Sequence, residues 1–262
     1  MTAIGGEHML YAAERQQRIL DEARRHGRVE VNAVATELDV TPETVRRDLT
    51  HLEGRGLLRR VHGGAIPVER LGDEPSLATR STRLTAEKKR IAARALDEIE
   101  EGATVLLDAG STTGAIAELL PSDRELTVVT NSVQTGALLA AHDKLTLFVV
   151  GGRVRNRTGA TVGEWAGRAL RDITVDVAFI GTNGVTPEHG LTTPDQAEGT
   201  IKRAMVGCAR RVVAVADASK FGVDHFHGFA DLAQLDRIIT DDSLDRTVAA
   251  AVEALGPEVT RA

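Results

Sequence analysis

Residues 41–65 read TPETVRRDLTHLEGRGLLRRVHGGA, and this stretch constrains the fold of the chain more than any other. Its first threonine can cap a helix, and Pro42 suits the first helical position, where the N–H that proline lacks has no partner anyway. Val45, Leu49 and Leu52 follow at spacings of four and three residues, so they form one apolar stripe. The stretch therefore begins with a helix that is buried along one side.

A basic hairpin is expected after this helix. From Arg55 to Ala65 the chain has three arginines, a histidine, no acidic residue, and two glycines that suit a tight turn. Upstream, the apolar spacing predicts helices over Arg15–His26 and Ala33–Leu38, the second capped by Asn32. Three short helices and a hairpin form a winged helix-turn-helix, which places one helix in a groove of DNA.

The residues expected to contact DNA lie off the apolar stripe and on the hairpin. Arginines on a helix surface are usually only solvated, so Arg46 and Arg47 alone would predict little. Their position directly before an acid-free basic hairpin favours DNA, with the helix in the groove and the hairpin on the phosphates. The predicted DNA-contacting residues are Thr41, Glu43, Thr44, Arg46, Arg47, His51, Arg59, Arg60 and His62.

Because the chain is acidic overall, its predicted contact with DNA must be confined to a small region. Up to residue 66 there are ten basic and ten acidic residues, and the remaining 22 basic and 28 acidic residues account for the net charge of −6. An acidic body repels DNA, so affinity must come from a small basic patch. The single cysteine, Cys208, excludes an internal disulfide and fits a reducing cytoplasm.

Nothing in the sequence suggests export or a membrane. The first residues, MTAIGGEHML, lack the basic start and apolar run of a signal peptide, and no apolar run is long enough for a bilayer span. We expect a cytoplasmic protein without a membrane partner. The expected division is an N-terminal extension over 1–13, the winged helix-turn-helix over 14–66, a linker over 67–83 and a second domain over 84–262.

The second domain alternates short apolar runs with amphipathic helical ones. Because the runs are apolar on both faces, the expected fold is α/β, a mainly parallel sheet between two helix layers, as in Rossmann-like three-layer domains. The expected strands are Thr104–Asp108, Leu126–Thr130, Leu145–Val150, Val175–Ile180, Arg211–Ala216 and Arg237–Thr240.

Small polar residues follow these strands, where parallel sheets bind ligands. After the first strand, residues 108–114 read DAGSTTG and lead into a helix expected over Ala115–Leu120, which suits a phosphate, although an ordinary capped turn explains the run equally well. It is neither a Walker loop nor a GxGxxG loop. Asn131 and Asn183 could recognise sugar hydroxyls, and Lys220 could neutralise a phosphate. The predicted ligand-binding residues are Asp108, Gly110, Ser111, Thr112, Thr113, Thr130, Asn131, Gly151, Gly152, Asn183, Gly184 and Lys220.

Both expected domains resemble those of one protein family. The segments TVRRDL (44–49) and LLRRVHGGA (57–65) resemble the signature of DeoR-type bacterial transcription regulators, departing from it only at Val45, where isoleucine is commoner. The likeness runs from about Glu14 to the C-terminal helix. It implies a sensor domain similar in fold to ribose-5-phosphate isomerase, in which residues 110–113 hold phosphate and Thr130, Asn131, Asn183, Gly184 and Lys220 surround the sugar.

The resemblance also implies a function. Most relatives look like repressors of sugar uptake or catabolism that release their operator when a phosphorylated sugar binds. Residues 190–195 and 220–222 resemble members linked to fructose, so fructose 1-phosphate is the first expected effector. A homodimer or a higher even oligomer is expected on double-stranded operator DNA, because such heads bind repeated half-sites.

Two other classes remain open from the residues. A sugar-phosphate isomerase with a DNA-binding appendage would need a carboxylate base, and Asp108, Asp195 and Glu198 are conceivable ones. The loop Gly181–Gly184 lacks the acidic pair of such isomerases, so no catalytic residue is predicted. An architectural DNA protein would need no ligand site at all.

Other polar residues have simpler explanations. Glu198 and Lys202 are four apart on a helix beginning near a Thr193 cap, as an exposed ion pair would be. Arg153, Arg155 and Arg157 alternate and are left outside the predicted site. His225 and His227 lack a third ligand, so neither a metal nor another cofactor is expected.

Overall fold

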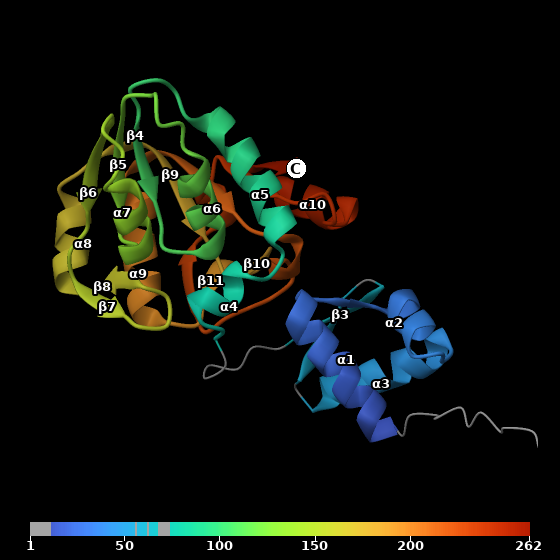
Figure 1. The fold of residues 1–262 in the computed structure, drawn as a ribbon. Coiled ribbons are helices and arrows are strands. Elements are labelled where there is room, and N and C mark those ends of the chain that lie inside the picture. Colours follow the sequence, from blue (N-terminus) through green and yellow to red (C-terminus); the bar gives the residue numbers. More distant parts are fainter. Residues whose placement is uncertain (1–11, 56, 62, 68–73) are drawn as a thin grey trace, which may run out of the picture. The chain divides into compact units, whose positions relative to one another are not determined.

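The computed structural model describes residues 12–55, 57–61, 63–67 and 74–262 (Figure 1). The chain divides into two compact units, residues 1–69 and 70–262. Of the predicted DNA-contacting residues, His62 lies outside the described ones. No helix of the described chain combines the length and the apolar character that crossing a bilayer requires.

The smaller unit has three helices and a three-stranded antiparallel sheet, as the sequence predicts for a winged helix-turn-helix. Ile19, Val45, Leu49 and Leu52 are buried in one core, which confirms the apolar stripe. The sheet order is β1-β3-β2. The elements are α1 (Ala12–His26), β1 (Val29–Glu30), α2 (Val31–Glu37), α3 (Pro42–Gly54), β2 (Leu58–Val61) and β3 (Gly64–Pro67).

The start of α3 is as expected, but the start of α2 is not. Thr41 caps α3, because its hydroxyl accepts a hydrogen bond from the amide of Thr44 at 3.2 Å. The predicted Asn32 cap is wrong, since α2 begins one residue earlier. The two-residue strand β1 runs straight into this helix, and the amide of Val31 donates to the carbonyl of Gly63 at 2.9 Å. A tertiary hydrogen bond thus replaces the side-chain cap.

The larger unit contains a seven-stranded sheet in which every neighbouring pair is parallel, in the order β15-β14-β12-β9-β4-β5-β6. All six expected strands are present, and the sequence analysis missed only the C-terminal strand β15, which lies at an edge of the sheet. The strands are β4 (Thr104–Leu107), β5 (Leu126–Thr130), β6 (Leu145–Val149), β9 (Val175–Gly181), β12 (Ala209–Val215), β14 (Arg237–Thr240) and β15 (Glu258–Arg261).

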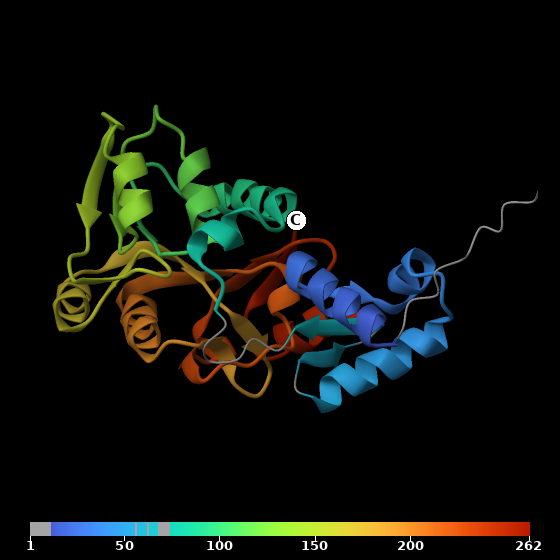
Figure 2. The ribbon, with the colours of Figure 1, turned by 60° about the horizontal axis from the view of Figure 1, so that its bottom comes forward.

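Helices cover both faces of this sheet, as its apolar strands require. Successive strand residues alternate between faces, so that Leu107 packs beneath α5, α6 and α7, while Leu106 packs beneath α8, α9 and α10. Figure 2 shows the teal and green helices on one side and α8 and α9 on the other. The helices are α5 (Thr85–Ala95), α6 (Ser111–Leu119), α7 (Val133–Leu139), α8 (Glu164–Arg171), α9 (Gln196–Cys208) and α10 (Arg246–Glu253).

Short elements lie at both ends of the strands of this sheet. They were missed in the sequence because three or four residues give too little periodicity. They are the hairpin β7 (Arg153–Arg155) and β8 (Ala160–Val162), the sheet of β10 (Gly184–Thr186), β11 (Gly190–Thr193) and β13 (His227–Ala230), and the 3-10 turns η1 (Leu96–Glu98), η2 (Ala218–Lys220) and η3 (Leu232–Gln234).

The segment 67–83, expected to be irregular, contains a helix. This helix, α4 (Leu77–Ser81), is capped by Ser76, whose hydroxyl accepts from the amide of Thr79 at 3.2 Å. The amide of Leu77 donates to the carbonyl of Arg157 at 2.9 Å. Residues 74–81 thus fold against the larger unit.

A buried ion pair ties α1 to α3 in the smaller unit. Asp48 is only 4% exposed, and its carboxylate accepts from Arg15 Nε at 2.5 Å, Arg15 Nη2 at 3.2 Å and Gln16 Nε2 at 3.0 Å. The aspartate within TVRRDL therefore faces the protein, while the arginines beside it face outward. Its partner lies 33 residues away, so local spacing could not reveal the pair.

Replacing Asp48→Ala should destabilise the smaller unit by about 3 kcal/mol, because the buried guanidinium of Arg15 loses its counter-charge. Hydrogen exchange of α1 amides in the full chain measures this. The matched control is Glu43→Ala, which breaks the exposed pair to Arg46 and should cost under about 1 kcal/mol. Equal protection of α1 in both variants would contradict the assignment.

Candidate functional site

The exposed face of α3 carries the predicted groove residues together. Glu43, Arg46, Arg47 and His51 are exposed and Thr44 is half-buried, and all lie away from the buried stripe. Arg46 forms an ion pair with Glu43 at 3.2 Å. Within the described part of the chain, Arg47 has neither a hydrogen-bond nor an ion-pair partner, so its guanidinium is available to a ligand.

The hairpin is fastened to α3. The amide of Arg60 donates to Glu53 Oε1 at 2.8 Å, and its guanidinium donates to the hydroxyl of Thr50 at 3.2 Å. Arg59 lies half-buried on β2. Thr41 uses its hydroxyl for the helix cap and lies 2.9 Å from the Thr44 hydroxyl. Thr41 and Arg60 therefore form hydrogen bonds within the protein. The guanidinium that is available to DNA is that of Arg47 on α3.

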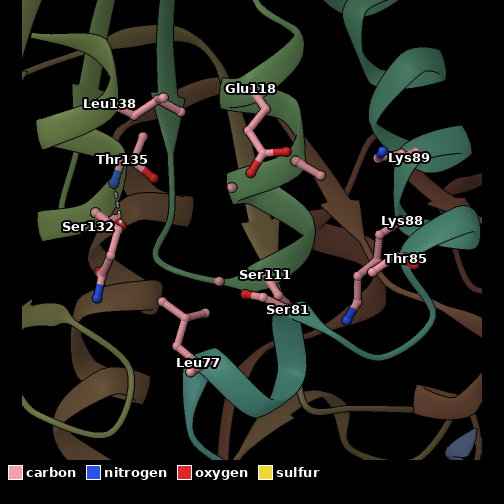
Figure 3. Close-up of a pocket in the computed structure, with 15 residues that line it drawn as sticks. Leu77, Ser81, Thr85, Lys88, Lys89, Ser111, Glu118, Ser132, Thr135 and Leu138 are labelled. Atoms are coloured by element: carbon pink, nitrogen blue, oxygen red, sulfur yellow. Dashed lines mark hydrogen bonds between the residues drawn. The ribbon is translucent and has the colours of Figure 1, made fainter.

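A cavity of about 400 Å³ opens in the larger unit between α4, the start of α5, α6 and α7 (Figure 3). Gly110 and Ser111 are the only predicted ligand residues that line it. The other lining residues are Leu77, Ala78, Ser81, Thr85, Lys88, Lys89, Gly114, Ala115, Glu118, Ser132, Gln134, Thr135 and Leu138.

The hydroxyl run beside this cavity is helical, so the expected helix start at Ala115 is wrong. Helix α6 already begins at Ser111, and Gly110 precedes it. The first backbone N–H groups of a helix have no partner within it and carry partial positive charge. Thr112 and Thr113 are buried, and Thr113 Oγ1 donates to the carbonyl of Gly110 at 3.1 Å. The two threonines support the turn, while Ser111 faces the cavity.

Thr130 and Asn131 hold neighbouring loops together. Asn131 is 2% exposed; its Oδ1 accepts from the amide of Ala109 at 2.9 Å and its Nδ2 donates to the carbonyl of Thr161 at 3.3 Å. Thr130 is fully buried and donates to the carbonyl of Leu107 at 2.7 Å. Both side chains are thus occupied within the protein, in contrast to the expected sugar contacts.

A buried ion pair between Asp108 and Lys202 lies at the carboxyl end of β4. Lys202 donates to the Asp108 carboxylate and, at 2.8 Å, to the carbonyl of Gly181, whose amide donates back to Asp108 at 3.0 Å. Burial raises the pKa of Asp108, and the ammonium of Lys202 opposes that shift. Asp108 therefore joins the ends of β4 and β9 to α9. It does not line the cavity.

The predicted exposed ion pair between Glu198 and Lys202 is wrong. Both side chains are buried, and they bind different partners. Glu198 accepts from the hydroxyl of Thr158 and from Arg155 at 3.2 Å. Asp195, rather than Thr193, caps α9, because its carboxylate accepts the amide of Glu198 at 2.9 Å.

Arg155, left outside the predicted site, is the centre of a charged cluster. It binds Glu74 at 2.6 Å, Asp195 at 2.9 Å and Glu198 at 3.2 Å. Burial, with Glu198 nearby, raises the pKa of Glu74. Arg157 next to it donates to the carbonyl of Glu74. These contacts attach the chain entering α4 to the β7–β8 hairpin.

The remaining predicted residues are mostly structural. Asn183 is buried and accepts from the Thr193 hydroxyl at 3.2 Å. A Cβ at Gly184 would overlap the carbonyl of Val223, so only glycine fits there. Gly151 is exposed, and Gly152 has a φ of 152° that favours glycine. The described residues offer the half-buried Lys220 side chain no hydrogen-bond or ion-pair partner.

Lys88 lines the cavity and was missed by the sequence analysis. Its Nζ donates to the carbonyls of Arg80 and Arg83 at 2.5 and 2.7 Å, which holds α4 in place. The pKa of Lys88 is lowered to about 8, mainly by burial; the charges of Lys220, Arg80 and Arg83 contribute to this lowering, and the charge of Asp217 opposes it. The only signal in the sequence is the lysine pair that opens this helix.

Comparisons with known proteins agree with both units. Residues 15–70 match the DeoR-like helix-turn-helix domain and residues 83–242 match the DeoR C-terminal sensor domain. The chain belongs to the DeoR family of transcriptional regulators. It is 38% identical to the HTH-type transcriptional regulator GlpR of Haloferax volcanii, over 94% of this chain and 96% of that protein. It is 36% identical to an uncharacterized HTH-type regulator, FruR, of Bacillus subtilis, over 87% and 90%.

Among solved structures, the sensor fold is similar to a ribose-5-phosphate isomerase bound to phospho-erythronic acid. The identity is 23%, the match covers 52% of this chain and 54% of that one, and the TM-score is 0.39. The two family models confirm the expected family, and the parallel sheet with helices on both faces confirms the expected α/β architecture of its DeoR sensor domain.

In the absence of ligand, Asn131→Ala should lower the free energy of unfolding of the DeoR sensor domain. It leaves the amide of Ala109 and the carbonyl of Thr161 buried and unpaired, which costs about 2–4 kcal/mol, or roughly 5–10 °C in Tm. Calorimetry of the full chain measures this. Ser111→Ala is the control, because its hydroxyl is unpaired within the described residues and its loss should leave Tm unchanged. An unchanged Tm for Asn131→Ala would show that its amide is not structural.

Proposed function

We propose that this DeoR-family chain represses genes for sugar uptake or catabolism and releases its operator when a phosphorylated sugar enters the cavity beside α6. Two features of one chain support the proposal. The smaller unit has an exposed cationic face on α3, and the larger unit has a cavity whose donors suit an anion. Relatives include the glycerol-3-phosphate regulon repressor of Escherichia coli, 29% identical. A repressor of this kind acts on chromosomal DNA, so we place it in the cytoplasm.

The DNA contact rests on α3. Arg47 is exposed and unpaired among the described residues, and Arg46 and His51 lie on the same face. Because residues 1–66 have no net charge, a few such groups must supply the affinity. We infer that Thr44, Arg46 and Arg47 meet base edges while Arg59, Arg60 and His62 lie near phosphates. Two heads of an even-numbered homo-oligomer would read repeated half-sites.

Arg47→Ala should weaken operator binding by about 1–3 kcal/mol, roughly 5- to 150-fold, while leaving ligand binding in the other unit unchanged. Gel-shift titration at fixed salt measures the affinity. The matched control is Arg124→Ala, an exposed arginine of the larger unit. If Arg47→Ala binds operator as tightly as the wild type, α3 does not enter the groove.

The cavity has the donors that a phosphate requires. The N-terminus of α6 at Ser111 and the side chain of Lys88 border it. The start of α7 also lines the cavity, but there the amides of Val133 and Thr135 already donate to Gly159 and Ser132. Unpaired helix N–H groups and an ammonium together bind a dianion better than either does alone. Fructose 1-phosphate is the first ligand to test, and Asn183, Gly184 and Lys220 stay proposed contacts of its sugar.

We propose that this site binds without turnover. An isomerase needs a free carboxylate at the sugar carbon. Asp108 is bonded to Lys202, and Glu198 to Arg155 and Thr158, while residues 181–184 contain no acid. The carboxylates nearest the strand ends are therefore occupied as structural partners.

Phosphate affinity should depend on the charge of Lys88. Because the pKa of Lys88 is about 8, its ammonium is intact below pH 8 and is lost above it. The affinity for fructose 1-phosphate should therefore fall about twofold from pH 7 to pH 8 and about fifteenfold from pH 7 to pH 9.2. In Lys88→Met the affinity should be low and independent of pH. Isothermal titration with fructose 1-phosphate, and with fructose as the uncharged reference, measures this.

Lys144→Met is the matched control, since this exposed lysine lies outside the cavity lining and its charge is screened by salt. It should bind within about threefold of the wild type. Lys88→Met should also bind operator normally and fail to release it. If the wild type keeps full affinity at pH 9.2, Lys88 is not a phosphate ligand, and isomer products in the same samples would overturn the non-enzymatic assignment.

A further inference from the structure

One edge of the seven-stranded sheet is open. Strand β6 pairs with β5 on one side, and no other described strand pairs with its second side (Figure 1). Proteins usually protect such edges with charged residues, proline or a bulge. The sequence of β6 is LTLFV, which contains neither a charge nor a proline.

The backbone of β6 presents regular hydrogen-bonding groups at this open edge. The amide of Val150 donates to the carbonyl of Thr130 on β5 at 2.8 Å. Successive amides along a strand point to opposite edges, so the amides of Phe148 and Thr146 also point toward β5. The N–H and C=O groups of Leu147 and Val149 therefore point to the open edge.

The side chains around this edge are apolar and exposed. Phe148 is 57% and Val149 50% exposed. Val133 and Leu138 are each 43% exposed on α7, the helix that packs on β6. Four exposed apolar side chains therefore lie together on and beside an uncharged edge strand, which is typical of an interaction surface.

We propose that a second copy of this chain pairs with β6 in antiparallel orientation, about a two-fold axis at Phe148. In this register, Leu147 lies opposite Val149 of the partner subunit, and each pair exchanges two hydrogen bonds. All four open N–H groups are then satisfied. Phe148 lies opposite the partner's Phe148 in a non-hydrogen-bonded pair, where side chains approach most closely.

Charge complementarity selects a second copy over a foreign peptide. Asp143 and Arg153 lie five residues before and after Phe148; both are exposed, and neither has a partner within the described residues. The two-fold axis brings Asp143 to the same end of the interface as Arg153 of the partner subunit. Opposite charges on the two segments that flank β6 are what antiparallel self-pairing requires.

This inference rests on the even-numbered homo-oligomer of the proposed function and identifies its interface. It can be tested without DNA. The full chain is studied by sedimentation velocity at a concentration where the wild type shows one species. Phe148→Asp, which places two carboxylates face to face on the axis, should halve the sedimenting mass. Phe226→Asp is the matched control, since Phe226 is 70% exposed outside this surface, and it should keep the full mass.

A charge swap tests the register. Asp143→Arg and Arg153→Asp should each weaken self-association at least tenfold, by placing like charges at both ends, and the double variant should restore it. Val149→Pro should also halve the mass, because it removes two of the four edge donors without touching the pairing to β5. Far-UV circular dichroism confirms that each variant is folded.

The inference is overturned if the wild type is a monomer, if folded Phe148→Asp keeps the full mass, or if the double charge variant stays weakened. A stable wild-type oligomer that binds no promoter fragment would instead refute the proposed function and leave the interface standing. Hydrogen exchange gives an independent reading: the amides of Leu147 and Val149 should be protected in the wild type and exposed in Phe148→Asp.

Discussion

The sensor domain depends on the buried ion pair between Asp108 and Lys202. Burying two charges costs several kcal/mol each, and their attraction offsets this only when further hydrogen bonds satisfy both groups. Gly181 supplies them with both its amide and its carbonyl. The pair thus joins the ends of the two central strands, β4 and β9, to helix α9. The same helix carries Glu198, which holds Arg155, so α9 contributes buried charges to two polar clusters.

The spacing of residues in the sequence predicted those features that depend on residues close together in the chain. The stripe of Val45, Leu49 and Leu52, the Thr41 cap and the six central strands follow from the chemistry of residues close together in the chain. Partners far apart in sequence were not predictable in this way: Asp108 and Lys202 are 94 residues apart, and Glu198 and Lys202 have the spacing of a surface pair. The hydroxyls and amides at the strand ends were recognised as important, but most of them bind the protein itself. A buried amide and a ligand-binding amide are the same residue type, and only burial distinguishes them.

Helix α7 connects two surfaces with different roles. Its N-terminal residues Ser132 and Thr135 line the cavity, and its other side packs on β6, where Val149 approaches Gly136 so closely that a Cβ there would overlap it. A rigid helix cannot shift at one surface without shifting at the other. A ligand that draws α7 toward α6 therefore also acts on the edge strand that we assign to self-association. The seven residues of α7 thus connect the proposed ligand cavity with the proposed dimer interface.

The same reasoning applies to α4, on the opposite side of the cavity. Leu77 and Ser81 line the cavity, and Lys88 holds the end of α4 through two carbonyls. The residues just before α4 are fixed by Glu74 to Arg155, and the chain preceding them leads in sequence to the winged helix-turn-helix. A ligand changes DNA affinity only if it binds two arrangements of the protein differently. Because α4 contributes both to the cavity wall and to the first anchored turn of the sensor domain, it is the element through which such a difference reaches the reading head.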